Sequence, residues 1–240
     1  MRVTYLEEPS GKSIELNQLI LNNSIRLNNS NDLDGLIEKI GNSKYVLLGE
    51  ASHGTHEYYT WRTQITKKLI EKKGFSFIAV EGDWPDCYKV NRYIKNYPDA
   101  GKNAFEVLHT FDRWPTWLWA NWEVVALTEW MRKHNTNLSE NSKVGIYGLD
   151  VYSLWESLDA VISYLDKKDP AAKKTAMNAL KCFEPFGEEE GQSYARATLM
   201  VPVTCENEVV DLLTEIRRKM ISYNNDREAV MSAEQNALVA

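Results

Sequence analysis

Three short apolar runs, each followed by a stretch with helical periodicity, constrain the fold of this chain more than any other feature. The runs are Tyr45–Leu48, Phe75–Val80 and Val144–Leu149, and each has the length of a buried strand. Strands that alternate with helices are typical of α/β proteins, in which neighbouring strands pair in parallel. The sequence therefore predicts a helix-rich, three-layer α/β domain around a small, mostly parallel sheet.

The segments between and after these runs carry apolar residues at helical spacing. Predicted helices cover about residues 33–40, 58–69, 85–94, 116–134, 154–165, the stretch after Asp169-Pro170, 209–220 and 229–240. Residues 1–30 are polar and Asn-rich, and we expect a partly extended lead-in. Residues 184–201 have no clear period, and we expect a loop or lid-like insertion. Residues 1–240 are thus interpreted as one domain.

Composition excludes several classes of protein. A net charge of -6 disfavours binding to nucleic acid, because an acidic chain repels phosphate. No window of 18 apolar residues occurs, so no membrane-spanning segment is expected. The cysteines, Cys87, Cys182 and Cys205, form no CxxC pair, so neither a zinc site nor a disulfide framework is indicated. Without a signal-like N-terminus, we expect a reducing, cytoplasmic location.

Polar residues follow all three predicted strands. Glu50 and His53 come after the first, Glu81 and Asp83 after the second, and Asp150 and Tyr152 after the third. Functional groups of open α/β sheets collect at the carboxyl ends of the strands. We therefore expect these carboxylates to converge near one point, and this convergence is the main functional signal in the sequence.

His53 is the strongest candidate for a general base. Imidazole titrates near neutral pH and can take a proton from water. A neighbouring carboxylate, from Glu50 or Glu81, would fix its tautomer and stabilise the imidazolium. The alternative is a helix cap or a satisfied surface group, but its place directly after a buried strand favours function.

The two glutamates have a structural alternative, because each could form an ion pair with Arg62 or Arg92. Arg62 would then neutralise the acidic cluster or hold an anionic group of a substrate. His56, three residues after His53, raises the alternative of a metal site, but no Cys and no HExxH motif supports it. No metal and no cofactor is expected.

The remaining candidates have comparable alternatives. Asp83 and Asp150 could orient neighbouring side chains or cap the helices that follow them. Trp114 and Trp117, near the start of a Trp-rich helix, could contact a ligand or belong to the core. His109 and His134 have no supporting neighbours and are interpreted as structural. The sequence has no GxSxG elbow, P-loop or GxGxxG motif.

Four blocks of the chain resemble successive blocks of the erythromycin esterase family. They read LLGEASHGTHEYY, FIAVEGDWPDCYKVNRYI, TFDRWPTWLWANWEVVALTEWMRKHN and VGIYGLDVYSLWESL, in that order. The resemblance covers about residue 30 to the end and implies the fold of esterase-like and haem-iron-binding proteins, with some members labelled succinoglycan biosynthesis proteins. Family members usually run further, so the chain is expected to be truncated at its C-terminus, without another functional His.

The resemblance also implies hydrolysis of a cyclic ester, a macrolide lactone in the named members and hence antibiotic resistance, without a covalent Ser intermediate. His53 matches the base that activates water, Glu50 and Glu81 match the supporting glutamates, and Arg62 matches the nearby arginine. The expected partner is a small ester or lactone, contacted also by His56, Asp83, Trp114, Trp117, Asp150 and Tyr152, with a homodimer as one assembly. A non-catalytic remnant of the fold and a metal- or haem-binding protein are the alternatives.

Overall fold

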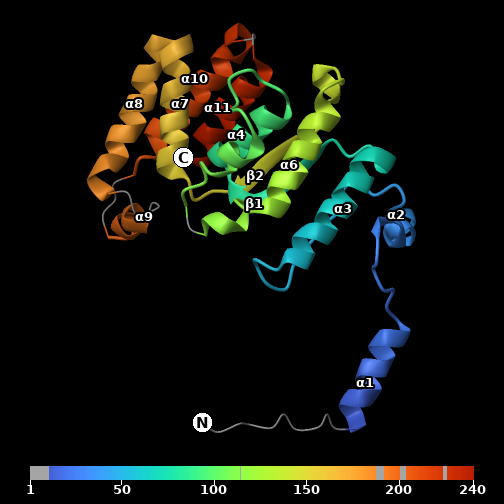
Figure 1. Ribbon diagram of the computed structural model, residues 1–240. Helices are drawn as coiled ribbons and strands as arrows, with labels where there is room; N and C mark the ends of the chain where they lie inside the picture. Colours follow the sequence, from blue (N-terminus) through green and yellow to red (C-terminus); the bar gives the residue numbers. More distant parts are fainter. Residues whose placement is uncertain (1–10, 114, 188–191, 201–203, 224–225) are drawn as a thin grey trace. The chain divides into compact units, whose positions relative to one another are not determined.

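The computed structural model describes residues 11–113, 115–187, 192–200, 204–223 and 226–240 (Figure 1). The chain divides into two compact units. The first contains the residues up to Ala51 together with Glu57–Phe75, and the second contains Ser52–His56 together with Ser76–Ala240. Each unit is built from its own internal contacts.

The first unit is helical. Its elements are α1 (Gly11–Asn22), η1 (Ser30–Leu33), α2 (Asp34–Ile40) and all but the first residue of α3 (His56–Lys73). Asp34, at the start of α2, accepts hydrogen bonds from Lys68 (2.8 Å) and Lys72 (2.9 Å) of α3. These contacts join two helices that the apolar periodicity had predicted, so both predictions are confirmed.

One strand prediction for the first unit is wrong. The lead-in, which we expected to be partly extended, contains α1 within its described residues. The run Tyr45–Leu48 is not a strand, and its Tyr45 and Leu47 side chains are 81% and 93% exposed. A strand needs a partner for its backbone groups, and in the described part of the chain only β1 and β2 pair.

The second unit is built on a parallel pair of strands, β1 (Phe77–Asp83) and β2 (Gly145–Asp150). Phe77 is in register with Gly145 and Asp83 with Asp150, with an irregularity between Val80 and Asp83. Parallel strands need a crossover connection, and here the connection contains helices. The predicted parallel α/β fold is confirmed, with two strands instead of three in the described residues.

The crossover between the strands carries α4 (Trp84–Ile94), α5 (Ala104–Leu108), η2 (Thr116–Leu118), α6 (Trp122–Asn135) and η3 (Glu140–Ser142). Buried Asn91 on α4 accepts a hydrogen bond from the backbone of Ile146, which joins the helix to β2. Pro85 lies in the first turn of α4, as predicted. The helix expected from Thr116 is instead a short 3₁₀ turn followed by α6, which Asn121 caps.

The C-terminal part of the second unit is a layer of helices with its own apolar core. Its main helices are α7 (Leu154–Lys168), α8 (Pro170–Phe183), α10 (Glu206–Lys219) and α11 (Arg227–Val239), joined by η4 (Glu184–Phe186), α9 (Gln192–Thr198) and η5 (Met220–Tyr223). Leu158, Leu165, Leu212 and Ile216 are fully buried in this core. Asp169 caps α8, accepting hydrogen bonds from the backbone of Ala171 and Ala172.

Cys182 and Cys205 form a disulfide, which corrects the inference that the cysteines indicate none. The bridge joins the end of α8 to the residue before α10, across the segment that was predicted to be a loop or lid. That segment contains η4 and α9, and its residues 188–191 and 201 lie outside the described residues. Sequence spacing could not predict the bridge, because the two cysteines are 23 residues apart and approach only through the fold. Among the described residues, no helix has the length and hydropathy of a membrane span.

Candidate functional site

The carboxyl ends of the two strands bring acidic side chains together, whereas the prediction had three strand ends converging. Asp83 and Asp150 end β1 and β2 and are direct partners in the register. The backbones approach closely here, since a Cβ atom on Gly148 would lie 2.2 Å from the Gly82 carbonyl oxygen. Glycine at position 148 therefore permits the contact that sets the two carboxylates side by side.

Arg113 holds the Asp83 carboxylate. Its Nη1 lies 3.1 Å from both carboxylate oxygens, and its guanidinium stands 4.9 Å over the ring of Tyr152. Burial raises the pKa of Asp83 from 3.8 to about 6, against the lowering effect of Arg113, and Asp150 adds to the rise. Burial and the charge of Glu81 also raise the pKa of Asp150. Glu81, Asp83 and Asp150 thus form an acidic cluster with one arginine.

The capping roles considered for the two aspartates are wrong. Asp83 occupies the N-cap position of α4, but its side chain accepts no hydrogen bond from the helix. Its carboxylate binds Arg113 instead, because a hydrogen bond between two charged groups is stronger than one from a neutral backbone N–H. Asp150 lies three residues before Ser153, which holds the N-cap position of α7.

The Asp83 carboxyl is expected to titrate near pH 6 in a carboxyl-detected NMR experiment, and higher in Arg113→Gln, which removes the nearby cation. Folding raises this pKa, so the native state keeps a proton that the unfolded state releases near pH 4. The contribution of this group to the free energy of unfolding is therefore greatest below pH 4, and it falls as the pH rises through 6. Asp83→Asn should remove that part of the fall, and an unchanged pH dependence of urea unfolding would contradict the assignment.

The segment Ser52–His56, which carries His53, is held within the second unit. Gly54 has a φ of +78°, and a Cβ atom there would lie 3.1 Å from the indole of Trp117. The Ser52 and Thr55 hydroxyls lie 3.0 Å apart, which closes the turn. Trp117 therefore supports the turn that carries His53, which is an exposed residue. Trp117 was predicted as a candidate ligand contact, and in the structure it lies against this turn.

His56 forms an ion pair with Glu123 through Nδ1. Its side chain is 66% exposed, and it is the first residue of α3. The hydrogen bond between His56 and Glu123 lowers the pKa of Glu123. Within the described residues, no group of three or more His, Cys, Asp or Glu side chains has the spacing of metal ligands.

Glu50 and Arg62 belong to the first unit and form an ion pair there. The Arg62 Nη2 and Glu50 Oε2 atoms lie 2.7 Å apart, and the Glu50 side chain is only 8% exposed. The pairing of Glu50 with Arg62, which the sequence analysis weighed as a structural alternative, is therefore present. Arg92, the other suggested partner, pairs with Asp99 and Asp226.

The structure also identifies residues that sequence reasoning passed over. Arg113 and Trp119 both touch the strand ends, and Trp119 donates from Nε1 to the carbonyl of Glu81 at 2.5 Å. Both residues lie in one block of the family resemblance, which was the available signal. Trp114 lies outside the described residues.

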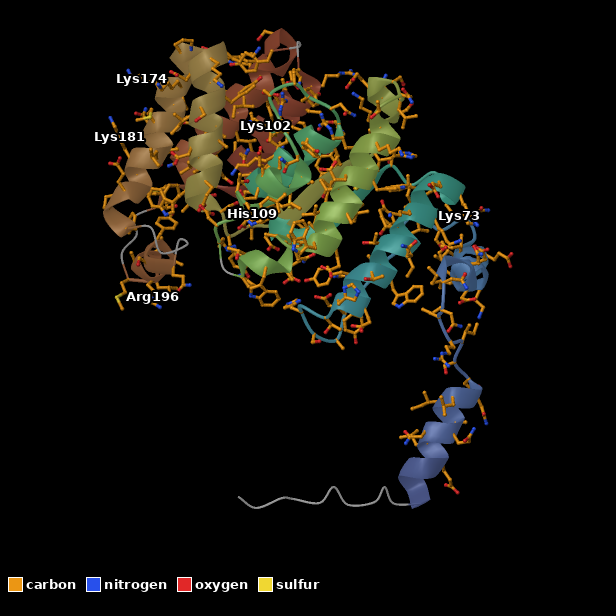
Figure 2. All side chains as sticks on the ribbon, in the orientation of Figure 1. Lys73, Lys102, His109, Lys174, Lys181 and Arg196 are labelled. Atoms are coloured by element: carbon orange, nitrogen blue, oxygen red, sulfur yellow. A yellow bond between two sulfur atoms is a disulfide. The ribbon has the colours of Figure 1, made fainter. Side chains whose placement is uncertain are left out.

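The two histidines interpreted as structural have local contacts. Figure 2 labels His109, which follows α5 and whose ring lies 3.8 Å from that of Phe105. Its Nδ1 lies 2.9 Å from the Phe105 carbonyl. The ring of His134 stacks on Trp130 of α6. Neither contact involves the acidic cluster, so His109 offers a control for experiments on His53.

Comparison with solved structures supports the fold. A succinoglycan biosynthesis protein shares 24% identity over 95% of this chain and 57% of its own, with a TM-score of 0.67. A protein from Bacillus cereus shares 22% over 95% and 55%, with a TM-score of 0.65. A mutant of the erythromycin esterase EreC in its open conformation shares 16% over 92% and 55%, with a TM-score of 0.57. The chain spans little more than half the length of these proteins.

A family assignment follows from the sequence itself. The sequence model of the erythromycin esterase family matches residues 70–240, which include both strands, the acidic cluster and the helical layer. The match covers well over half of the chain and agrees with the folds of the solved structures. The protein is a member of the erythromycin esterase family.

Proposed function

We propose that this chain contributes the water-activating site of a hydrolase that cleaves a carboxylic ester or macrolide-type lactone, with His53 as general base. The observation that carries the proposal is the acidic cluster at the strand ends, in a member of the erythromycin esterase family. Perturbed carboxylates gathered at the carboxyl edge of a parallel sheet are typical of catalytic sites.

The proposed reaction needs one base and one position for water. His53 takes a proton from water, and the hydroxide oxygen bonds to the carbonyl carbon of the ester. The tetrahedral intermediate collapses by breaking the bond to the alcohol oxygen, which receives the proton from the imidazolium. The products are a carboxylic acid and an alcohol, joined in one molecule when the substrate is a lactone.

The acidic side chains support this reaction in different ways. Glu81 is exposed beside the buried strand end, and in this proposal its charge stabilises the imidazolium of His53. Asp83, with its pKa near 6 and its contact to Arg113, keeps that arginine oriented beside Tyr152. Arg113 and Tyr152 then form the polar side of a substrate site. Glu50 as a second supporting carboxylate stays a prediction.

The proposal is tested by incubating the purified chain with matched pairs of macrocyclic lactones and open-chain esters near neutral pH. We expect hydrolysis at a steady rate, without an initial burst of product, because no acyl-enzyme forms. Acid quenching followed by intact mass measurement should show only the unmodified protein. A covalent acyl adduct would contradict direct attack by water.

Absence of hydrolysis across the panel by a folded protein would overturn the proposal and favour the non-catalytic alternative. One observation favours this alternative, because the chain covers only 57% and 55% of the length of the solved structures that it matches. In that experiment, an intact disulfide and a cooperative unfolding transition of the helical layer are the evidence that the protein is folded.

A further inference from the structure

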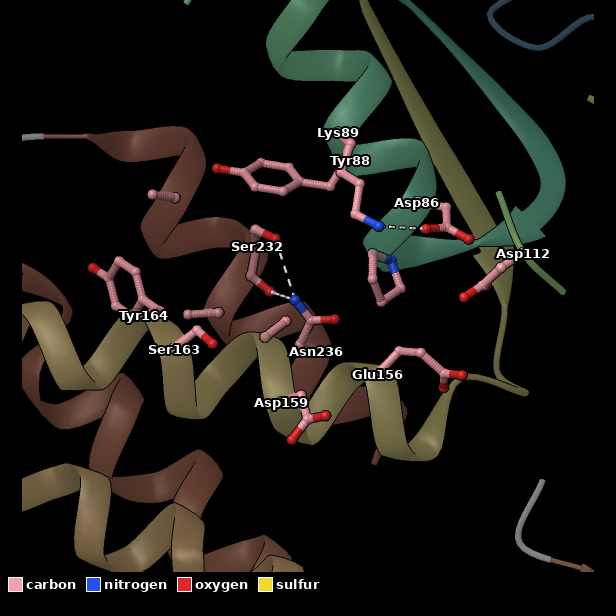
Figure 3. Close-up of a pocket in the computed structure, with 14 residues that line it drawn as sticks. Asp86, Tyr88, Lys89, Asp112, Glu156, Asp159, Ser163, Tyr164, Ser232 and Asn236 are labelled. Carbon is pink, nitrogen blue, oxygen red and sulfur yellow. Dashed lines mark hydrogen bonds and ion pairs between the residues drawn. The ribbon is translucent and has the colours of Figure 1, made fainter. Parts of the chain in front are cut away.

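A cleft of about 380 Å³ opens between α4, α7 and α11 in the second unit. Figure 3 shows it lined by the N-terminal half of α4, the first three turns of α7 and one face of α11, together with Asp112. Its volume lies within the range of small-molecule sites. It includes none of the residues to which the proposed hydrolysis assigns a role, so its function is a separate question.

The cleft is lined by a buried polar atom that has no hydrogen-bond partner among the described residues. Asn236 on α11 is 2% exposed, and its Nδ2 donates to the Ser232 carbonyl (2.9 Å) and hydroxyl (3.3 Å). These bonds fix the orientation of the amide, since a carbonyl oxygen can only accept. In the described part of the chain, no donor reaches the buried Asn236 Oδ1. Figure 3 shows this oxygen directed into the cleft, away from Ser232.

An unsatisfied buried acceptor destabilises the folded protein, because it has lost its hydrogen bond to water and gained none in return. The cost is recovered when a ligand supplies a donor, so Asn236 points to a ligand that donates a hydrogen bond at this position. The amide oxygen accepts only, which excludes a carboxylate or phosphate oxygen as its direct partner.

The charge of the lining residues defines the ligand further. Among the described residues that line the cleft, the acidic ones are Asp86, Asp112, Glu156 and Asp159, and the one cation is Lys89, which pairs with Asp86 at 2.8 Å. Burial and the charge of Asp112 raise the pKa of Asp86, while Lys89 lowers it. Four carboxyl groups and one ammonium leave an excess of negative charge around the buried acceptor, which suits a cation.

We propose that this cleft binds a small organic ligand with a protonated primary amine, which donates to Asn236 Oδ1 and whose charge is balanced by Glu156 and Asp159. A primary ammonium combines positive charge with several N–H donors, and the two features of the cleft require both. A metal ion fits less well, because the described carboxylates do not gather in groups of three with ligand spacing. The proposal does not depend on the proposed hydrolysis.

Calorimetric titration of the full chain with 1,4-diaminobutane, in buffer of constant ionic strength, tests this proposal. Two probes serve as controls: 1,4-butanediol has the same length without charge, and tetramethylammonium has the charge without an N–H donor. We expect the diamine to bind at least about tenfold more tightly than either probe, which is a difference of about 1.4 kcal/mol. A diamine that binds no more tightly than either control probe would overturn the proposal.

Variants locate the binding. Glu156→Gln and Asp159→Asn change exposed residues, so both should fold, and each should raise the Kd of the diamine about threefold to tenfold. Asp211→Asn, an equal charge change at an exposed residue of α10 outside the cleft, should leave it unchanged. Asn236→Leu should abolish binding, and the two acidic variants keep the test decisive if it does not fold. An equal weakening by Asp211→Asn would show nonspecific attraction and overturn the site.

Discussion

His53→Ala is expected to lower kcat/KM for ester or lactone hydrolysis by about 10²–10⁴, the usual contribution of a general base. Without the imidazole, no base removes a proton from the attacking water, and no acid donates a proton to the leaving alcohol. The free energy of unfolding should change little, because His53 is exposed on a turn that Gly54 and Trp117 hold. Steady-state kinetics beside urea unfolding measures both quantities.

The matched control for this variant is His109→Ala. His109 is also exposed, but its contacts are with Phe105 at the end of α5, outside the acidic cluster. We expect its activity to equal that of the wild type. A His53→Ala protein with full activity, or an equal loss in both variants, would refute the role of His53 as base.

Gly148→Ala is expected to destabilise the protein by about 1–3 kcal/mol or more. The new methyl group would lie 2.2 Å from the Gly82 carbonyl oxygen and 2.7 Å from backbone atoms of Asp83. Since these neighbours are backbone atoms, relief requires the two strands to separate at their carboxyl ends. Asp83 and Asp150 would then move apart, so activity should fall even in the protein that remains folded.

The control is Gly35→Ala on α2, where a Cβ atom would meet nothing within 4 Å. Alanine in a helix is favoured over glycine by about 0.5–1 kcal/mol, so this change should preserve or slightly increase stability. Urea unfolding of both variants measures the difference. If Gly148→Ala is as stable as Gly35→Ala, the close approach of the strands is not a feature of the folded protein.

The sequence predicted those parts of the fold that depend on local periodicity. The strands at 77–83 and 145–150 and the helices that follow them arise from apolar runs and amphipathic spacing, which the chain carries within each segment. The acidic ends of both strands could be predicted for the same reason, because parallel strands place their carboxyl ends at one edge.

The errors concern features that depend on distant parts of the chain. Tyr45–Leu48 has the composition of a strand, but strand formation requires a pairing partner, which composition cannot supply. The bridge between Cys182 and Cys205 requires α8 and α10 to pack first. Arg113 reaches Asp83 from a loop 30 residues later, and no periodic pattern predicts such a contact.

A double-mutant cycle between His53 and Glu81, measured on kcat/KM for a hydrolysed ester or lactone, tests the central claim most directly. If the two side chains act together on one water molecule, Glu81→Gln should cost activity in the wild type and almost nothing once His53 is alanine. Losses that add in full, with each variant reducing activity independently, would contradict a shared water-activating site.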